Sequence, residues 1–117
     1  MRLDVPVDNA TPFVDLISLD HCRRNAGTFV PYGDLELAVF WLTGPERVVV
    51  TDNACPHASG NLSAGEVAGN VVTCPWHQWE FDLDRGVCTH SEQARIRRFP
   101  AEIRQGSVWV RLPARQS

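Results

Sequence analysis

Cys55-Pro56-His57 and Cys74-Pro75-Trp76-His77 are two short cysteine–histidine segments, separated by the 16 residues from 58 to 73. Each segment offers one thiolate, a soft ligand, and one imidazole, which suits several transition metals. Without a secretion signal, closely spaced Cys and His indicate metal binding rather than disulfide formation. The two segments therefore predict a metal centre with four ligands: Cys55, His57, Cys74 and His77.

At these two segments the chain resembles the Rieske 2Fe–2S ferredoxin family. Both segments have Pro directly after Cys, and the second continues into Trp79-Glu80-Phe81-Asp82, as members of the family commonly do. The resemblance implies one Rieske-type 2Fe–2S cluster. In such a cluster two Cys bind one iron and two His bind the other. The thiolates would come from Cys55 and Cys74, and the imidazoles from His57 and His77.

Around the ligands the chain departs from the high-potential, respiratory members of this family. Those members have a second cysteine pair that bridges the two loops, and Ser and Tyr hydroxyls that donate hydrogen bonds to the cluster sulfurs. Here the corresponding residues are Gly60 and Trp76 for the bridge, and Trp79 and Phe81 for the donors. Fewer donors stabilise the reduced cluster less, so we expect a low-potential centre at roughly −150 mV, the bottom of the family range.

Two further features of the loops follow from the same resemblance. Trp76, Trp79 and Phe81 are expected to shield the cluster from water, whereas the histidine side stays open for electron exchange. Gln78 stands where many members have Gly after the second histidine, so the resemblance defines the loop conformation less well at this position.

Zinc is the main alternative metal, because two Cys and two His also satisfy a tetrahedral structural site. Zinc fingers usually place their two His together after a Cys pair, whereas here each segment mixes the two ligand types. The remaining candidate ligands are expected to bind no metal. We expect Cys22 and Cys88 to be free, partly buried thiols, His21 and His90 to be surface residues, and Asp82 and Asp84 to be turn residues before Gly86.

The composition is that of an ordinary globular chain with one domain, residues 1–117. Hydrophobic residues make up 44% of the chain and charged residues 21%. A net charge of −3 argues against a nucleic-acid partner, which requires a basic surface. No apolar run approaches the roughly 18 residues of a spanning helix, and the N-terminus has no apolar core of signal-peptide length. We therefore expect no membrane partner and a cytoplasmic location.

Short runs of β-branched and aromatic residues between Gly, Pro and Asp predict an all-β fold, a small β-sandwich or barrel. Two-residue turns at Gly33-Asp34, Gly69-Asn70 and Gln105-Gly106 join successive strands. The Gly-rich interval of about 53–85, which holds both ligand segments, is predicted to be a cluster-binding lobe inserted into the β domain. The expected strands are residues 13–18, 28–32, 35–41, 48–51, 66–68, 71–73, 80–83, 96–99, 101–104 and 107–112.

The first functional prediction is a one-electron carrier, a Rieske ferredoxin that passes electrons from a flavin reductase to an oxygenase. The resemblance covers the chain from about Val14 to Leu112 and leaves no room for the non-haem iron domain of a terminal oxygenase. Such a chain would be an electron-transfer component and would not catalyse a reaction alone.

Two other functions remain open at this point. The chain is also similar to the Rieske-like small subunit of an NAD(P)H-dependent nitrite reductase, whose partner would be the large subunit. Those subunits have a similar length and carry a larger residue in place of Gly after the second His, as Gln78 is here. The third possibility is a structural zinc module that mediates protein contacts.

Overall fold

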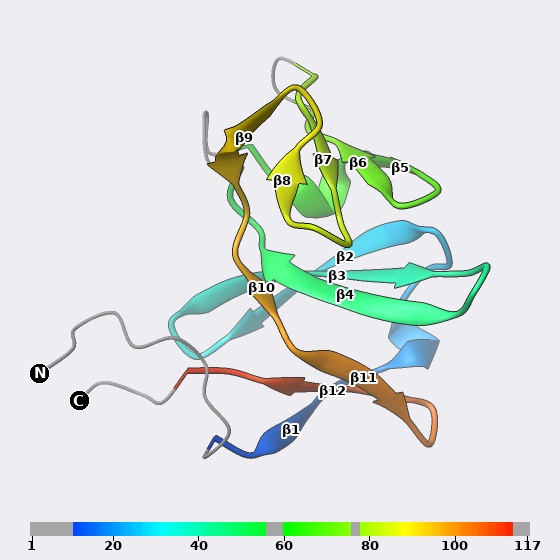
Figure 1. The fold of residues 1–117 in the computed structure, drawn as a ribbon. Coiled ribbons are helices and arrows are strands. Elements are labelled where there is room, and N and C mark those ends of the chain that lie inside the picture. Colours follow the sequence, from blue (N-terminus) through cyan, green and yellow to red (C-terminus); the bar gives the residue numbers. More distant parts are fainter. Residues whose placement is uncertain (1–10, 56–59, 76–77, 114–117) are drawn as a thin grey trace, which may run out of the picture.

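Three antiparallel sheets form the fold (Figure 1). The computed structural model describes residues 11–55, 60–75 and 78–113. Within these ranges the chain forms twelve strands, and its helical segments are two 3-10 turns, η1 (Leu19–His21) and η2 (Leu62–Ala64). The predicted all-β fold is confirmed.

The sheets are stacked in three layers. The first contains β1 (Phe13–Ser18), β12 (Ser107–Arg111) and β11 (Ala101–Arg104), in that order. The second contains β10 (Arg98–Phe99), β4 (Arg47–Asp52), β3 (Leu35–Leu42) and β2 (Ala26–Tyr32). The third contains β5 (Glu66–Ala68), β6 (Val71–Thr73), β7 (Glu80–Asp82), β8 (Val87–Cys88) and β9 (Ser91–Arg95). In Figure 1 the third sheet lies above the second and the first lies below it, so the second sheet is the central layer.

Strand β3 contributes to two separate hydrophobic cores, because the central sheet is covered on both faces. Leu37 and Val39 belong to the core shared with the first sheet. The alternate residues Ala38 and Phe40 belong to the core shared with the third sheet. All four side chains are 0% exposed. An uninterrupted apolar run is the pattern expected of a strand that is buried on both faces.

The two-residue turns predicted from the sequence are confirmed by the strand register. The residues that flank them pair directly, Tyr32 with Leu35, Ala68 with Val71, and Arg104 with Ser107. Gly33 has a φ of 61° and Gly69 a φ of 63°. Glycine adopts this left-handed region without the steric cost of a Cβ, which is why these positions turn so tightly.

Two strands of the third sheet were not predicted. Two predicted strands, 80–83 and 107–112, end one residue early, and a third is shorter by two residues. β8 has two residues and β9 (Ser91–Arg95) is largely polar, so neither shows an apolar period. The strand expected at 96–99 is reduced to Arg98–Phe99. Ile96 instead turns into the core, where it is 6% exposed, and its amide donates to the Gly86 carbonyl at 2.9 Å. The third sheet therefore continues to Arg95.

A network of hydrogen-bonded polar side chains joins the third sheet to the central sheet. Arg47, at the start of β4, donates two hydrogen bonds to the Asp84 carboxylate, at 3.2 and 3.0 Å. The Asn70 amide bridges Asp82 and Asp84, at 3.1 Å to each. The hydrogen bond from Arg47 holds the pKa of Asp84 below its usual value of 3.8. Asp82, the last residue of β7, and Asp84, in the turn that follows, thus have a structural role at the strand end before Gly86, as expected.

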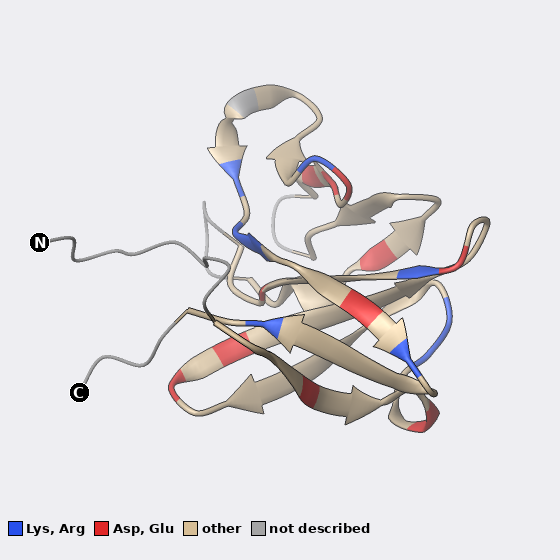
Figure 2. Cartoon of the chain, turned by 60° about the horizontal axis from the view of Figure 1, so that its bottom comes forward, with Lys and Arg blue, Asp and Glu red and all other residues tan. Residues whose placement is uncertain are grey.

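Charged residues of both signs are interspersed over the described part of the chain, as Figure 2 shows. No described helix is long and apolar enough to span a membrane.

Candidate metal centre

Cys55 lies in a loop that leaves the central sheet after β4 ends at Asp52. The chain returns to this point a few residues later, where Ala54 pairs with Asn61 in an isolated antiparallel bridge. The Cys55 amide donates to the Gly60 carbonyl at 2.7 Å, which closes the loop directly at the cysteine. Two of its residues, Pro56 and the predicted ligand His57, lie outside the described residues.

Cys74 lies at the start of a second loop, between β6 and β7. The strands pair up to Thr73 and Glu80, and the Cys74 amide then donates to the Trp79 carbonyl at 2.7 Å. Gln78 has a φ of 57°, in the left-handed region that a residue with a Cβ adopts at some cost. Trp76 and the predicted ligand His77 lie outside the described residues.

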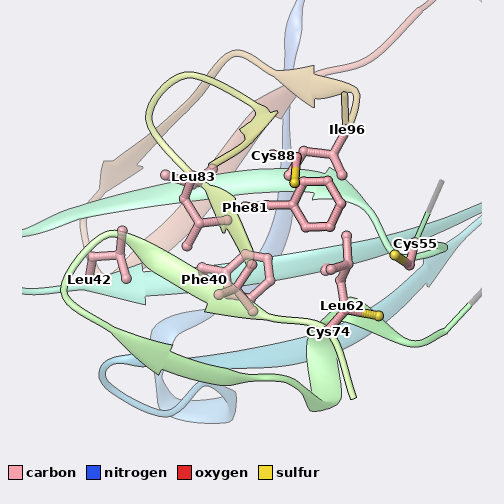
Figure 3. Packing of buried hydrophobic residues seen from close by; sticks show 12 residues of the cluster. Phe40, Leu42, Cys55, Leu62, Cys74, Phe81, Leu83, Cys88 and Ile96 are labelled. Carbon is pink, nitrogen blue, oxygen red and sulfur yellow. The ribbon is translucent and has the colours of Figure 1, made fainter. Parts of the chain in front are cut away.

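The structure brings Cys55 and Cys74 together in the core between the central and third sheets. Cys55 is 2% exposed and Cys74 is 0% exposed, and both belong to one cluster with Leu62 and Phe81. Figure 3 shows the two sulfur atoms at the same end of this cluster, where both loops begin. No disulfide joins any of the four cysteines, so neither thiol is used by one.

This arrangement fits a metal centre with two thiolate ligands. A buried thiolate needs a compensating positive charge, because an unpaired charge in an apolar core is costly. A metal ion held by Cys55 and Cys74 would supply that charge and would favour the deprotonated thiols. Within the described residues no group of three or more His, Cys, Asp and Glu converges. The described part of the centre therefore consists of the two cysteines and their loop closures.

Two of the three aromatic residues expected to shield the cluster can be located. Trp79 is half-buried and packs against the core cluster that contains both cysteines, and Phe81 is 0% exposed within it. Phe81 lies on β7, opposite Val72 on one side and Cys88 on the other. The part of β7 that faces this core therefore presents the phenyl ring of Phe81, which has no hydroxyl group to donate to a cluster sulfur.

The other candidate ligands lie elsewhere, as expected. Cys88 is buried beside Phe81 and Ile96, and Figure 3 shows its sulfur away from those of the two loop cysteines. Cys22 packs against the other core, and burial raises its pKa above the ordinary 9.0, although a hydrogen bond with Thr28 lowers it. The exposed His90 has a Glu80 carboxylate at 4.0 Å.

His21 is also exposed, and its neighbour Cys22 donates through Sγ to the Ser18 carbonyl at 3.7 Å, closing the η1 turn. The predictions of surface histidines and free cysteines are confirmed.

Comparison with known proteins identifies the family. The model of the Rieske 2Fe-2S domain matches residues 14–100. The chain belongs to the Rieske family. Its cofactor is thus a Rieske-type 2Fe–2S cluster, and the family match disfavours the structural zinc module.

Relatives of this Rieske chain fall into two groups by length. The chain is 28% identical over 102 residues to the ferredoxin component of the naphthalene 1,2-dioxygenase/salicylate 5-hydroxylase systems of Ralstonia, which covers 86% of this chain and 95% of that ferredoxin. It is 38% identical over 77 residues to the methylxanthine N1-demethylase NdmA of Pseudomonas putida, which covers 59% of this chain. The match spans about a fifth (22%) of that longer relative.

Solved Rieske structures share the fold over most of the chain. The ferredoxin of Sphingomonas yanoikuyae B1 superposes with a TM-score of 0.75 at 28% identity, covering 87% of this chain and 100% of that one. The E. coli protein NirD superposes with a TM-score of 0.78 at 24% identity, covering 89% and 99%. Both neighbours are small chains of about the same extent as this one.

Proposed function

We propose that this chain is a one-electron carrier that passes electrons from a reductase to an oxygenase. The observation that carries the proposal is the extent of the match to the Ralstonia ferredoxin component, which covers 95% of that relative. A likeness over almost the whole of an electron-carrier protein favours the same role more than a likeness to a fifth of a demethylase does. The partners would be a flavin reductase and a terminal oxygenase.

The proposed ligands are Cys55 and Cys74 for one iron and His57 and His77 for the other. When bound, the cluster accepts and releases a single electron. The two cysteines hold it from the apolar core, where they are 2% and 0% exposed, and Trp79 and Phe81 exclude water on that side. The proposed domain comprises residues 1–117, with a cluster-binding lobe at about 53–85, and the proposed location is the cytoplasm.

The small subunit of a nitrite reductase is the second candidate function. Gln78 favours it, because a larger residue follows the second His in those subunits and because its φ of 57° shows that this chain tolerates a side chain there. An electron-transfer assay and a co-purification experiment distinguish the two candidate functions. A carrier for an oxygenase should support substrate oxidation by a reductase–oxygenase pair, whereas a nitrite reductase subunit should co-purify with a sirohaem protein.

We expect anaerobically purified protein to contain about two iron and two acid-labile sulfide ions per chain. Its reduced form should give an EPR signal whose average g value lies below that of ferredoxins with four Cys ligands, because two neutral imidazoles replace thiolates. Metal analysis and EPR spectroscopy check this. A zinc content near one per chain in iron-supplemented preparations would contradict the proposed cofactor.

The midpoint potential should lie at roughly −150 mV, in the lower part of the family range. Trp79→Ser combined with Phe81→Tyr introduces two hydroxyl groups beside the core that holds the ligand cysteines. Each new bond to a cluster sulfur, at about 1 kcal/mol, would raise the potential by tens of millivolts.

Protein-film voltammetry at fixed pH compares the wild type with this double variant. The matched control makes the same exchanges in the first sheet, Trp109→Ser with Phe13→Tyr, and should leave the potential unchanged. A wild-type potential above roughly +200 mV would show that Trp79 and Phe81 do not set it.

A further inference from the structure

Asn53 is a buried polar residue at the point where the Cys55 loop leaves the central sheet. Among the described residues two polar side chains are buried, those of Thr51 and Asn53. The Thr51 hydroxyl donates to the carbonyl of the next residue, Asp52, at 2.8 Å. Asn53, 2% exposed, instead bonds to segments that are distant from it along the chain. Burial of an amide is costly unless its donors and acceptor form hydrogen bonds.

The backbone of Asn53 joins the start of the loop to two other elements. Its amide donates to the Glu36 carbonyl on β3 at 2.9 Å. Its carbonyl accepts from the Leu62 amide in η2 at 2.8 Å. These two bonds do not depend on the side chain, so they persist in any variant that keeps the fold.

The side chain of Asn53 makes two further bonds across the same loop. Its Oδ1 accepts from the Ser63 amide at 2.9 Å, and its Nδ2 donates to Asn61 Oδ1 at 3.0 Å. Ser63 lies in the first turn of η2, where amides have no partner within the helix. Asn61, the N-cap residue of η2, makes no capping bond with its own side chain. Asn53 therefore supplies the cap from the opposite side of the loop.

The Cys74 loop does not need side-chain hydrogen bonds to hold its two arms together, because the backbone hydrogen bonds of a strand pair do so. β6 and β7 pair at three successive positions, and the Cys74–Trp79 bond extends the same ladder. Beyond the end of β4, by contrast, the described residues of the Cys55 loop form a single bridge, between Ala54 and Asn61. The separation of its two arms is fixed by the bonds of Asn53 and the Cys55–Gly60 bond.

We propose that Asn53 is a positioning residue for the 2Fe–2S cluster, and that it acts through the Cys55 loop. Its carboxamide holds the returning segment Asn61–Ser63 at a fixed separation from the outgoing one, and so sets the position of the Cys55 thiolate before the cluster binds. The inference rests on the proposed ligand set, because it requires Cys55 to be a ligand.

The test compares the rate at which the cluster is lost. Asn53→Ala removes both side-chain bonds and leaves the Ser63 amide without its acceptor, so we expect about tenfold faster loss of visible absorbance in the presence of a chelator. The matched control is Asn70→Ala, which also removes two side-chain hydrogen bonds, but in the β5–β6 turn away from the ligand loops. That control should lose the cluster within about twofold of the wild-type rate, even if its melting temperature falls.

Two further measurements keep the result interpretable. Asn61→Ala removes a single side-chain bond from an exposed residue, so this variant should fold. It should accelerate cluster loss less than Asn53→Ala does, and it tests the proposal if Asn53→Ala does not fold. Hydrogen exchange of the Ser63 amide should accelerate in Asn53→Ala and stay slow in Asn70→Ala.

Equal loss rates for Asn53→Ala and Asn70→Ala, or a wild-type rate in both Asn53→Ala and Asn61→Ala, would overturn the positioning role. A wild-type protein without iron and sulfide would instead overturn the proposed cofactor ligands, so the two failures are distinguishable.

Discussion

Replacement of Cys55 or Cys74 by serine should abolish most of the visible absorbance of the purified protein. Both side chains are almost fully buried at the same end of one core, so no other described thiol can replace either of them there (Figure 3). A serine hydroxyl does not ionise as a thiol does, and the thiolate is the form that binds the metal. Visible spectra together with iron and sulfide analysis measure the effect.

The control for these variants removes the other two cysteines. Cys22 lies against the other core, and the Cys88 sulfur is separated from the two loop cysteines within the shared core (Figure 3). The double Cys22→Ser, Cys88→Ser variant should keep the wild-type spectrum. Because Cys88 is 3% exposed, a buried hydroxyl there is expected to lower stability by about 1–3 kcal/mol, and Cys88→Ala avoids this cost. Loss of the cluster in the Cys22→Ser, Cys88→Ala variant would show that the ligand assignment is wrong.

The second large effect is expected at Gly65, where the segment after the Cys55 loop meets the strand before the Cys74 loop. A Cβ at Gly65 would lie 2.4 Å from the Thr73 carbonyl oxygen and 2.9 Å from a methyl group of Val72. The carbonyl oxygen belongs to a paired strand and cannot move freely. Any side chain at this position must therefore push η2 away from β6.

Gly65→Ala should lower the free energy of unfolding by about 3 kcal/mol, at the upper end of the usual cost of overpacking. It should also lower the iron content, because the displaced segments carry the two ligand loops. Denaturant unfolding and iron analysis measure the two effects. The matched control is Gly69→Ala, where no atom lies within 4 Å of the added Cβ and the φ of 63° alone costs about 1 kcal/mol. Full iron content in Gly65→Ala would contradict this prediction.

Much of the fold could be predicted because its signals are local. The two-residue turns with Gly33 and Gly69 were recognisable, and so was the apolar run of β3. The strands β8 and β9 could not be predicted, because a two-residue strand and a polar strand have no period to detect. Their pairing depends on β7 and on the turn at Gly86, which are contacts between segments rather than properties of either one.

The candidate site could be predicted to a different extent. The pattern of Cys55-Pro56-His57 and Cys74-Pro75-Trp76-His77 predicts Cys55 and Cys74 as ligands, and the structure adds that both are buried at one end of a core. The role of Asn53 was missed, because an Asn before a loop usually indicates an exposed turn. Its burial follows from the return of the chain at Leu62 and Ser63, which a single sequence does not reveal. All four ligands remain predictions, and two of them, His57 and His77, lie outside the described residues.

The burial of Cys22 and Cys88 has a consequence for oxidative damage. Oxidation to sulfenic acid and intermolecular cross-linking both begin from an accessible thiolate. Cys88 is 3% exposed, so an oxidant has little access to its sulfur. Burial raises the pKa of the half-buried Cys22, so this thiol presents little thiolate at neutral pH. In the proposed role, as a carrier for an oxygenase, the protein would work in the presence of oxygen. Burial thereby keeps Cys22 and Cys88 from becoming sites of inactivation. A chain that has lost its cofactor in air would not be cross-linked through these two thiols and could take up a new cluster.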